Sequence, residues 1–312
     1  MKLRFLVILA FMLMQVSAAN AAEKLTVILD WFVNPDHATL VVAQEKGLFK
    51  KYGLDVELIA PADASDPPKL VAAGKADLAI TYQPQLYYQI SADLPVTRIA
   101  TLVATPLNTL LVLKDGPVKT IADLKGKKVG YSVSGFDEAL LGVMLEGVGL
   151  TTKDITLINV NFSLSPSLLS GQVDAVIGAY RNFELFQMEI EGRPGHAFYP
   201  EEEGIPSYDE LIVIANSQKL SDERLKPFVR ALEEAVQYLI NHPDESWSLF
   251  IKKHKELDNK LNKEAWAATL PRFALRPGAL DVGRYNRFAK FMKGRGLIKE
   301  IPPIKSYAIA LD

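Results

Sequence analysis

The amino-acid sequence predicts an α/β protein made of two Rossmann-like lobes that are joined by a two-segment hinge. One local pattern, a helix followed by glycine, aspartate and an apolar strand, occurs at residues 70–80 and again at residues 168–177. In each copy apolar strands alternate with helices, which is typical of sheets with parallel strands. Two further apolar runs, at residues 110–113 and 211–215, flank the second copy and predict two crossings of the chain between the lobes.

A βαβ unit opens the first lobe. Residues 25–29 (LTVIL) form an uninterrupted apolar run, as expected of a buried parallel strand. Apolar residues then recur at helical spacing over residues 37–49, where Gly47 is expected to break the helix. Residues 54–59 form the next predicted strand.

The repeated pattern follows this unit. A short helix at residues 69–73 is expected to end at Gly74, because glycine readily adopts the left-handed conformation that closes a helix. Residues 77–81 follow as a third strand, with Asp77 at its start. The copy at residues 168–177 differs from this segment by one residue of length, which predicts two similar sheets.

A strand at residues 127–131 (KKVGY) and a helix at residues 136–146 open the second lobe. Tyr82 and Tyr180 stand at the C-terminal ends of the predicted strands in the two copies. Open α/β sheets bind their ligands at those ends. We therefore expect the ligand site between the two sheets.

The two crossings are expected near Lys114 and near Tyr208. From Asp222 onward, apolar residues at spacings of three and four predict a helix that covers the first lobe, whereas residues 276–302 show no regular pattern. The predicted boundaries are a signal peptide at residues 1–21, a first lobe at residues 22–113 plus 212–312, and a second lobe at residues 114–211.

The N-terminus has the pattern of a cleaved export signal. Lys2 and Arg4 precede an apolar stretch, and Ala19-Asn20-Ala21 forms an A-x-A cleavage site. The alternative is a membrane anchor, but about 12 apolar residues fall short of the roughly 20 that span a bilayer. We expect cleavage after Ala21 and a mature protein in the periplasm.

Composition narrows the function. Of the 312 residues 49% are hydrophobic and 23% charged, which is ordinary for a globular protein. The net charge of −2 gives no electrostatic attraction to nucleic acid or anionic lipid, so neither is expected as a partner. The absence of cysteine excludes disulfides, thiolate metal sites and a cysteine nucleophile.

Residues 30–37 (DWFVNPDH) are the most informative segment, because they follow the first predicted strand. Trp31 offers a flat face for stacking a ring, and Asp30 and Asn34 can accept hydrogen bonds from amino groups on that ring. His37 opens the next helix and is included among the candidates. The alternative is that Trp31 caps a core and His37 is an ordinary helix residue.

Further candidates lie at predicted strand ends and at the hinge, and aromatic residues recur among them. An aromatic cleft with carboxylate acceptors suits a planar, amine-bearing heterocycle better than an anion or a sugar. Some of these tyrosines are expected to pack rather than touch ligand. The candidates beyond residues 30–37 are Tyr82, Ser134, Phe136, Tyr180, Asn182, Glu184, Tyr208 and Glu210.

Catalysis has little support in the sequence. The four histidines, His37, His196, His242 and His254, lie far apart and match no metal-ligand spacing or nucleophile motif. There is no phosphate-binding glycine loop. We expect no catalytic residue, no metal and no cofactor.

With D-W-x-x-N-P-x-H at residues 30–37, G-L-F-K-K-Y-G-L-D-V at residues 47–56 and the two strand patterns, the chain resembles the thiamine-pyrimidine branch of the periplasmic solute-binding superfamily. The first motif is fairly specific, whereas the second recurs in nitrate, taurine and sulfonate receptors. The resemblance implies a type II periplasmic-binding-protein fold that closes over formylaminopyrimidine or hydroxymethylpyrimidine. It also implies permease and ATPase subunits of an ABC importer as partners.

By matching position, the resemblance implies ring contacts and polar contacts to the amine and the ring nitrogens. The implied ring contacts are Trp31, Tyr180 and Tyr208. The implied polar contacts are Asp30, Asn34, Glu184 and Glu210.

Two alternatives stay open. The superfamily also contains an enzyme that builds the thiamine pyrimidine from its own histidine and pyridoxal phosphate, and His37 lies where such a histidine belongs. That enzyme needs a lysine near Thr81 and cysteines near Tyr208, and this chain has neither. The same fold could instead bind an alkanesulfonate, nitrate or a flavin, and an anion would need a basic group such as Arg181.

Overall fold

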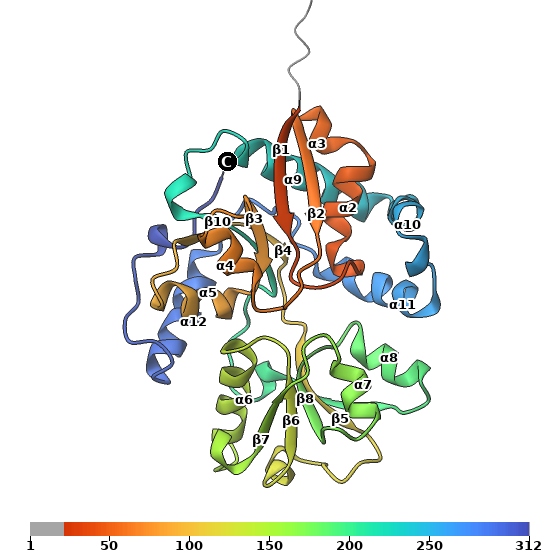
Figure 1. The fold of residues 1–312 in the computed structure, drawn as a ribbon, viewed down its shortest axis with the longest axis vertical. Helices are drawn as coiled ribbons and strands as arrows, with labels where there is room; N and C mark the ends of the chain where they lie inside the picture. The colour runs from red at the N-terminus through yellow and green to blue at the C-terminus, as the bar shows by residue number, and fades with distance from the viewer. Residues whose placement is uncertain (1–21, 312) are drawn as a thin grey trace, which may run out of the picture.

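The computed structural model describes residues 22–311, which fold into two lobes that each contain a five-stranded sheet (Figure 1). The predicted α/β class with two similar lobes is confirmed. Within residues 22–311, no helix combines the length and apolar character needed to cross a bilayer. The predicted signal peptide at residues 1–21 lies outside the described residues.

The first sheet is mixed. Its first three strands run parallel, and the fourth is antiparallel to both of its neighbours. The two central strands LAIT and LIVIAN are buried at every position, which explains their nearly continuous apolar sequence. In spatial order the strands are β2 (Leu54–Ile59), β1 (Glu23–Ile28), β3 (Leu78–Thr81), β10 (Leu211–Asn216) and β4 (Val96–Val103).

The second sheet repeats this arrangement strand for strand. Three parallel strands are again followed by one that is antiparallel to both of its neighbours. In spatial order they are β7 (Thr156–Asn159), β6 (Lys128–Tyr131), β8 (Ala175–Tyr180), β5 (Asn108–Leu113) and β9 (Gly195–Phe198). Thus β5 in the second sheet corresponds to β10 in the first, and each is the first strand formed after the chain crosses.

This sheet membership corrects the predicted first boundary. Strand β5 pairs with β8 and β9, so it belongs to the second lobe, although the sequence assigned residues 108–113 to the first. The chain therefore crosses between Val103 and Asn108 rather than near Lys114. The apolar run of β5 predicts a buried strand equally well in either sheet, because burial does not depend on which sheet the strand joins. The chain returns before β10.

The repeated pattern has the same structure in both lobes. Gly74 and Gly171 end α4 (Pro67–Ala72) and α7 (Leu164–Leu169) with φ of 69° and 73°, as expected of closing glycines. Asp77 then accepts a hydrogen bond of 2.8 Å from the backbone N–H of Thr26 in β1. Asp174 accepts the equivalent bond, 2.9 Å, from Lys128 in β6. The aspartate in each copy thus attaches one strand to its parallel neighbour.

The predicted helix at residues 37–49 is divided. A 3-10 turn, η1 (Pro35–His37), leads into α2 (Ala38–Glu45), and Gly47, with φ of 70°, separates α2 from α3 (Leu48–Lys51). Helix α9 (Leu225–Asn241) covers the first lobe as predicted, with Phe228 stacked on Phe49 at 5.4 Å between ring centroids. The other helices are α5 (Gln83–Ser91), α6 (Phe136–Glu146), α8 (Glu184–Ile190), α10 (Pro243–Lys253), α11 (Lys260–Thr269) and α12 (Val282–Gly294).

A buried arginine fixes the stretch that showed no sequence pattern. Arg98, in β4, is fully buried, and its guanidinium donates to the carbonyl oxygens of Pro277 (3.2 Å) and Ala279 (2.6 Å). It also donates to the carbonyl of Ile309 (3.0 Å). An arginine that satisfies several carbonyls can hold irregular backbone against a sheet. In α12, Arg284 donates to the carbonyl of Ala104 at 2.6 Å and pairs with Asp209, which places this helix beside the connections between the lobes.

Candidate ligand-binding site

A pocket lies between the two lobes, at the C-terminal ends of the parallel strands, where the fold predicts a ligand site. It holds about 470 Å³ of space between its walls, counting the part that opens to solvent. Residues from both lobes form its walls. We call it the interlobe pocket, and it is lined by Asp30, Trp31, Asn34, Asp36, Tyr82, Asn108, Ser132, Val133, Phe136, Asp137, Leu164, Gly178, Tyr180, Phe183 and Glu184.

The structure brings seven of the twelve candidate residues to this pocket and places the other five behind it, at its rim or between the lobes. Those in the lining are Asp30, Trp31, Asn34, Tyr82, Phe136, Tyr180 and Glu184. Those elsewhere are His37, Ser134, Asn182, Tyr208 and Glu210. Each of these five has contacts that define a different position.

His37 lies fully buried behind Asp30. Its Nδ1 accepts a hydrogen bond from the backbone N–H of Asn34 (3.2 Å), so the ring proton is on Nε2, which donates to Asp30 Oδ1 at 2.9 Å. Tyr82 donates to the other oxygen of Asp30 at 3.0 Å. Asn34 caps the η1 turn by accepting from the N–H of Asp36 at 2.8 Å. The DWFVNPDH segment therefore forms one hydrogen-bonded wall, in which His37 orients Asp30.

Aromatic side chains meet across the two lobes. Tyr82 stacks on Phe136 with ring centroids 5.1 Å apart and an interplanar angle of 16°. Trp31 meets Phe162 edge to face at 4.7 Å. Because each pair joins residues from different lobes, these contacts exist only when the lobes are close together. They give the pocket flat apolar walls.

Ser134 and Asn182 also join the lobes. The backbone N–H of Ser134 donates to the hydroxyl of Ser65 in the first lobe at 3.1 Å, at an exposed rim. The side chain of Asn182 is buried, and it donates to Asp36 at 2.6 Å and to Thr269 of α11 at 2.7 Å. Asn182 is therefore a contact between the lobes rather than part of the pocket lining.

Carboxyl groups dominate the polar lining. Burial raises the pKa of Asp36 to about 6. Burial likewise raises the pKa of Asp137 and of Glu184 to about 7. None of the described residues that line the pocket is a lysine or an arginine. The pocket is therefore suited to a ligand that donates hydrogen bonds or carries positive charge, and it is poorly suited to an anion.

The second lobe holds Asp137 in a close network. Its Oδ2 accepts from the backbone N–H groups of Ser132 (3.0 Å) and Val133 (2.8 Å), and its Oδ1 accepts from Asn108 (3.2 Å). Gly178, with φ of 99°, passes so close that a Cβ there would lie 2.8 Å from Asp137 Oδ2. Only glycine satisfies both the backbone conformation and this approach.

Tyr208 and Glu210 lie on the connection that returns to the first lobe. Glu210 accepts from the backbone N–H groups of Leu107 (2.5 Å) and Asn108 (3.0 Å), so it fastens the outgoing connection to the returning one. Burial raises the pKa of Glu210 to about 7. Tyr208 is buried, and its ring meets Phe288 of α12 edge to face. Neither residue lines the interlobe pocket.

Arg181, the basic residue considered for anion binding, lies outside the lining of the interlobe pocket. Its guanidinium forms hydrogen bonds of 2.5 and 2.9 Å with Glu201 and lies over the ring of Tyr199. It also donates to the backbone carbonyls of Leu107 (3.4 Å) and Asn108 (3.3 Å). Its hydrogen-bonding groups are thus directed at the connections between the lobes.

Sequence reasoning missed several lining residues. Asp36 stands inside residues 30–37 and Asp137 follows the candidate Phe136, but nothing in a sequence shows which of several neighbouring side chains points inward. Asn108 and Gly178 gave no signal, because their place depends on β5 lying beside β8. Phe183 sits between two chosen residues, Asn182 and Glu184.

Fold and pocket together define the class, a two-lobed protein of the type II periplasmic-binding-protein fold with a site enclosed between its lobes. The chain belongs to the NMT1/THI5-like family, which it matches over residues 34–246.

Two relatives cover most of the chain. A Haemophilus influenzae protein whose name places it in thiamine biosynthesis is 53% identical over 293 residues, 94% of this chain and 93% of its own. The formylaminopyrimidine-binding protein of Halalkalibacterium halodurans is 36% identical over 247 residues, 78% of this chain and 75% of its own. The chain is also similar to a 4-amino-5-hydroxymethyl-2-methylpyrimidine phosphate synthase of Saccharomyces cerevisiae, 27% identical over 78% of this chain and 74% of its own.

Solved structures agree on the fold. The alkanesulfonate-binding protein of Xanthomonas axonopodis pv. citri superposes with a TM-score of 0.70 and 18% identity, covering 92% of this chain and 99% of its own. A Candida albicans protein described as having the generic periplasmic binding protein fold superposes with a TM-score of 0.70 and 20% identity, covering 93% and 96%. At these identities the likeness concerns the fold alone.

Proposed function

We propose that this protein is the solute-binding component of an ABC importer and that it captures an aminopyrimidine precursor of thiamine, formylaminopyrimidine or hydroxymethylpyrimidine. The observation that carries this proposal is the composition of the interlobe pocket, in which aromatic faces surround carboxyl groups and no lysine or arginine lines the described walls. A planar ring stacks on aromatic faces, and its amino group donates to carboxylates. The name of the Halalkalibacterium relative supports the same ligand class.

The alternative ligands fit this pocket less well. An alkanesulfonate or nitrate would bring a negative charge to a lining that holds Asp30, Asp36, Asp137 and Glu184, with no cation in the described walls to balance it. Arg181, which could have supplied that cation, is paired with Glu201. A flavin would meet the same acidic walls with an extended three-ring system. Charge therefore favours a small, amine-bearing ring.

Binding fits the residues better than synthesis of the pyrimidine does. The resemblance to the synthase implies a lysine near Thr81 and cysteines near Tyr208, but residues 76–113 contain no lysine and the chain contains no cysteine. His37 is fully buried, and its ring is directed at Asp30. We therefore assign His37 a positioning role in the pocket wall.

Closure follows from the placement of the walls. Trp31, Asn34 and Tyr82 come from the first lobe, and Phe136, Tyr180 and Glu184 come from the second. A ligand that contacts both walls stabilises only the closed form, and a permease can distinguish that form from the open one.

We also propose that the protein is exported and works in the periplasm after cleavage behind Ala21. The test is N-terminal sequencing of the protein recovered from a periplasmic fraction. A sequence that begins at Ala22 supports export, and an intact Met1 in the cytosolic fraction contradicts it.

Thermal unfolding of the purified protein tests the ligand class. A ligand that binds only the native state adds about 2.7 kcal/mol of stability at 100 times its Kd, which raises the midpoint by several degrees. We expect a rise with hydroxymethylpyrimidine and formylaminopyrimidine, and none with taurine, nitrate or riboflavin. If only an anion or a flavin raised the midpoint, the protein would still be a solute-binding protein, but its ligand would not be an aminopyrimidine.

A further inference from the structure

The carboxyl groups of the interlobe pocket fall into two kinds. In Asp30 and Asp137 both oxygens already accept hydrogen bonds from the protein, from His37 and Tyr82 in the first case and from Ser132, Val133 and Asn108 in the second. These two groups shape the walls. Their acceptor capacity is largely used within the protein.

In each of the other two carboxyl groups, one oxygen receives no hydrogen bond from any other residue among those described. Asp36 is 1% exposed; its Oδ1 accepts from Asn182 and Thr269, while its Oδ2 is buried without any hydrogen-bond partner. Glu184 Oε2 accepts from the backbone N–H of Tyr180 at 2.7 Å, and no other residue among those described donates to its Oε1. A buried acceptor without a donor costs free energy, so Asp36 Oδ2 points to a donor that a ligand supplies. Glu184 belongs to the pocket lining, where a ligand can donate to its carboxyl group.

We propose that Asp36 and Glu184, one from each lobe, receive the N–H donors of the ligand and make the pocket select an aminopyrimidine over the corresponding oxopyrimidine. This inference rests on the proposed function. An amino group offers two N–H donors, whereas an oxo group in its place offers only lone pairs. The oxo form therefore presents lone pairs and one ring N–H to the two carboxyl groups, so at least one carboxyl oxygen would stay without a donor.

The same pair links binding to closure. Asp36 lies on η1 in the first lobe and Glu184 begins α8 in the second, so closing the lobes brings two carboxyl groups together. Without a ligand this approach combines like charges with an unpaired acceptor, which opposes closure. A ligand that donates to both removes that cost. The other titratable groups near the pair are Asp30, His37, Tyr180 and Arg272.

The hydrogen bonds of the pair allow substitutions that change only the free oxygen. In Asp36→Asn, the donor from Asn182 requires an oxygen at the position of Oδ1, so the new NH₂ group replaces the free Oδ2. In Glu184→Gln, the N–H of Tyr180 requires an oxygen at the position of Oε2, so the NH₂ group replaces Oε1. Each variant keeps the shape of the side chain and replaces an acceptor by a donor.

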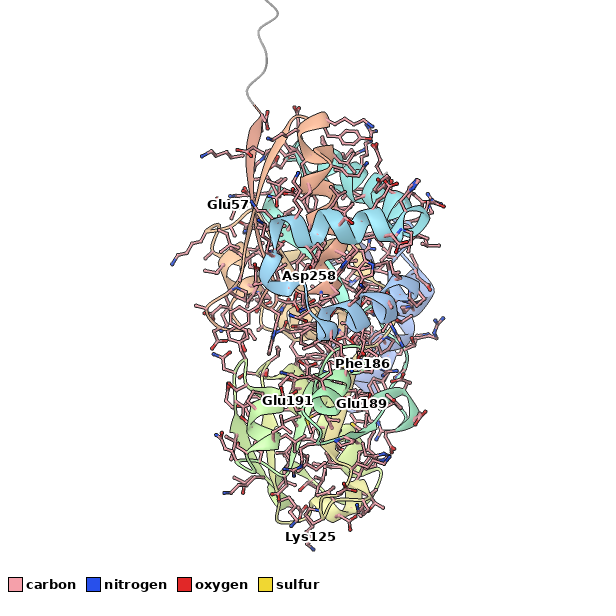
Figure 2. The ribbon with its side chains drawn as sticks, turned by 90° about the vertical axis from the view of Figure 1, so that its right-hand side faces the viewer. Glu57, Lys125, Phe186, Glu189, Glu191 and Asp258 are labelled. Carbon is pink, nitrogen blue, oxygen red and sulfur yellow. The ribbon has the colours of Figure 1, made fainter. Side chains whose placement is uncertain are left out.

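Two exposed carboxylates provide matched controls (Figure 2). Glu189→Gln makes the same change on the same helix as Glu184, and Asp258→Asn makes the same change as in Asp36 at an exposed position. Both remove one negative charge without touching the pocket lining.

The experiment is calorimetric titration of the full-length mature protein and the four variants with 4-amino-5-hydroxymethyl-2-methylpyrimidine and with its 4-oxo counterpart. We expect the unmodified protein and both controls to bind the amino compound at least about 100-fold more tightly than the oxo compound. Asp36→Asn and Glu184→Gln should each weaken binding of the amino compound at least about tenfold and reduce that preference.

Equal affinity of the unmodified protein for the two compounds would overturn the inference, whether or not the variants fold. So would variants that lose affinity equally for both compounds, because that result indicates a structural role only. An unmodified protein that binds neither compound would refute the proposed function itself. As a second measurement, small-angle scattering of the ligand-free variants should give a smaller radius of gyration than the unmodified protein, and an unchanged or larger radius would contradict the link to closure.

Discussion

Asn182 of the second lobe donates a hydrogen bond of 2.6 Å to the carboxyl group of Asp36 in the first. Both side chains are buried, and Asn182 also reaches Thr269 of α11. The two hydrogen bonds of Asn182 therefore join η1, the turn before α8 and α11 directly beside the ligand site. A contact of this kind exists only in the closed arrangement, so it contributes to closure and to ligand affinity together.

Asn182→Ala should weaken ligand binding by about five- to tenfold, because a lost buried hydrogen bond costs on the order of 1 kcal/mol. The ligand-free protein should also be more open, with a larger radius of gyration by small-angle scattering. Asn241→Ala is the control, since Asn241 is exposed and bonds only within α9. Calorimetry that gives the same affinity for Asn182→Ala and the control would show that the bond does not support closure.

Gly178→Ala should destabilise the protein by more than the conformational strain alone. Alanine at a φ of 99° is strained, and its Cβ would also lie 2.8 Å from Asp137. Gly171→Ala separates the two effects, because Gly171 has a φ of 73° and nothing within 4 Å of its Cβ position. We expect a loss of about 1–2 kcal/mol for Gly171→Ala and clearly more for Gly178→Ala in chemical denaturation. Equal losses would mean that Asp137 moves aside without cost.

The sequence was sufficient to predict the fold class and one wall of the site. The DWFVNPDH segment follows a strand, so its side chains had to lie at a sheet edge, and Asp30, Trp31 and Asn34 do line the pocket. The repeated pattern predicted two sheets, and in both lobes its glycine ends a helix with a positive φ and its aspartate accepts a hydrogen bond from the neighbouring strand.

The parts of the site that could not be predicted from the sequence depend on contacts between residues far apart in the chain. The place of Asn108 follows from β5 joining the second sheet, and an apolar run does not encode its partner strand. Likewise, Asp36 Oδ1 accepts a hydrogen bond from Asn182, which is 146 residues away in the sequence, and this contact leaves Oδ2 as the oxygen without a partner. Contacts of this range depend on the closed arrangement of the lobes and have no local signal.

Trp31→Ala should weaken binding of an aminopyrimidine by roughly tenfold to a hundredfold, since stacking a base on an aromatic side chain is worth about 1–3 kcal/mol. Trp31→Phe keeps a smaller flat face and should lose less affinity than Trp31→Ala. The thermal shift that hydroxymethylpyrimidine causes is measured for both variants. Trp247→Phe, in α10 and away from the pocket lining, is the control for changing a tryptophan at all. If Trp31→Ala showed the same thermal shift as the unmodified protein, the ring of the ligand would not stack on Trp31.

Asp137 should make stability fall as pH rises. Burial raises its pKa from 3.8 to about 7, so between these values the native state binds a proton that the unfolded state has released. Stability from this group is fully present below about pH 3.8 and is lost as the pH approaches 7. Tyr82 and Glu138 are the other titratable groups that interact with it.

Asp137→Asn should therefore flatten the decline in unfolding free energy between pH 4.5 and 6.5, by up to about 1.4 kcal/mol per pH unit. Asp123→Asn serves as the control, because hydrogen bonds from Lys119 and Thr120 lower the pKa of Asp123 and its contribution does not change in this range. Urea denaturation of the ligand-free protein at several pH values measures the slope, and parallel curves for Asp137→Asn and the unmodified protein would show that Asp137 is ionised throughout.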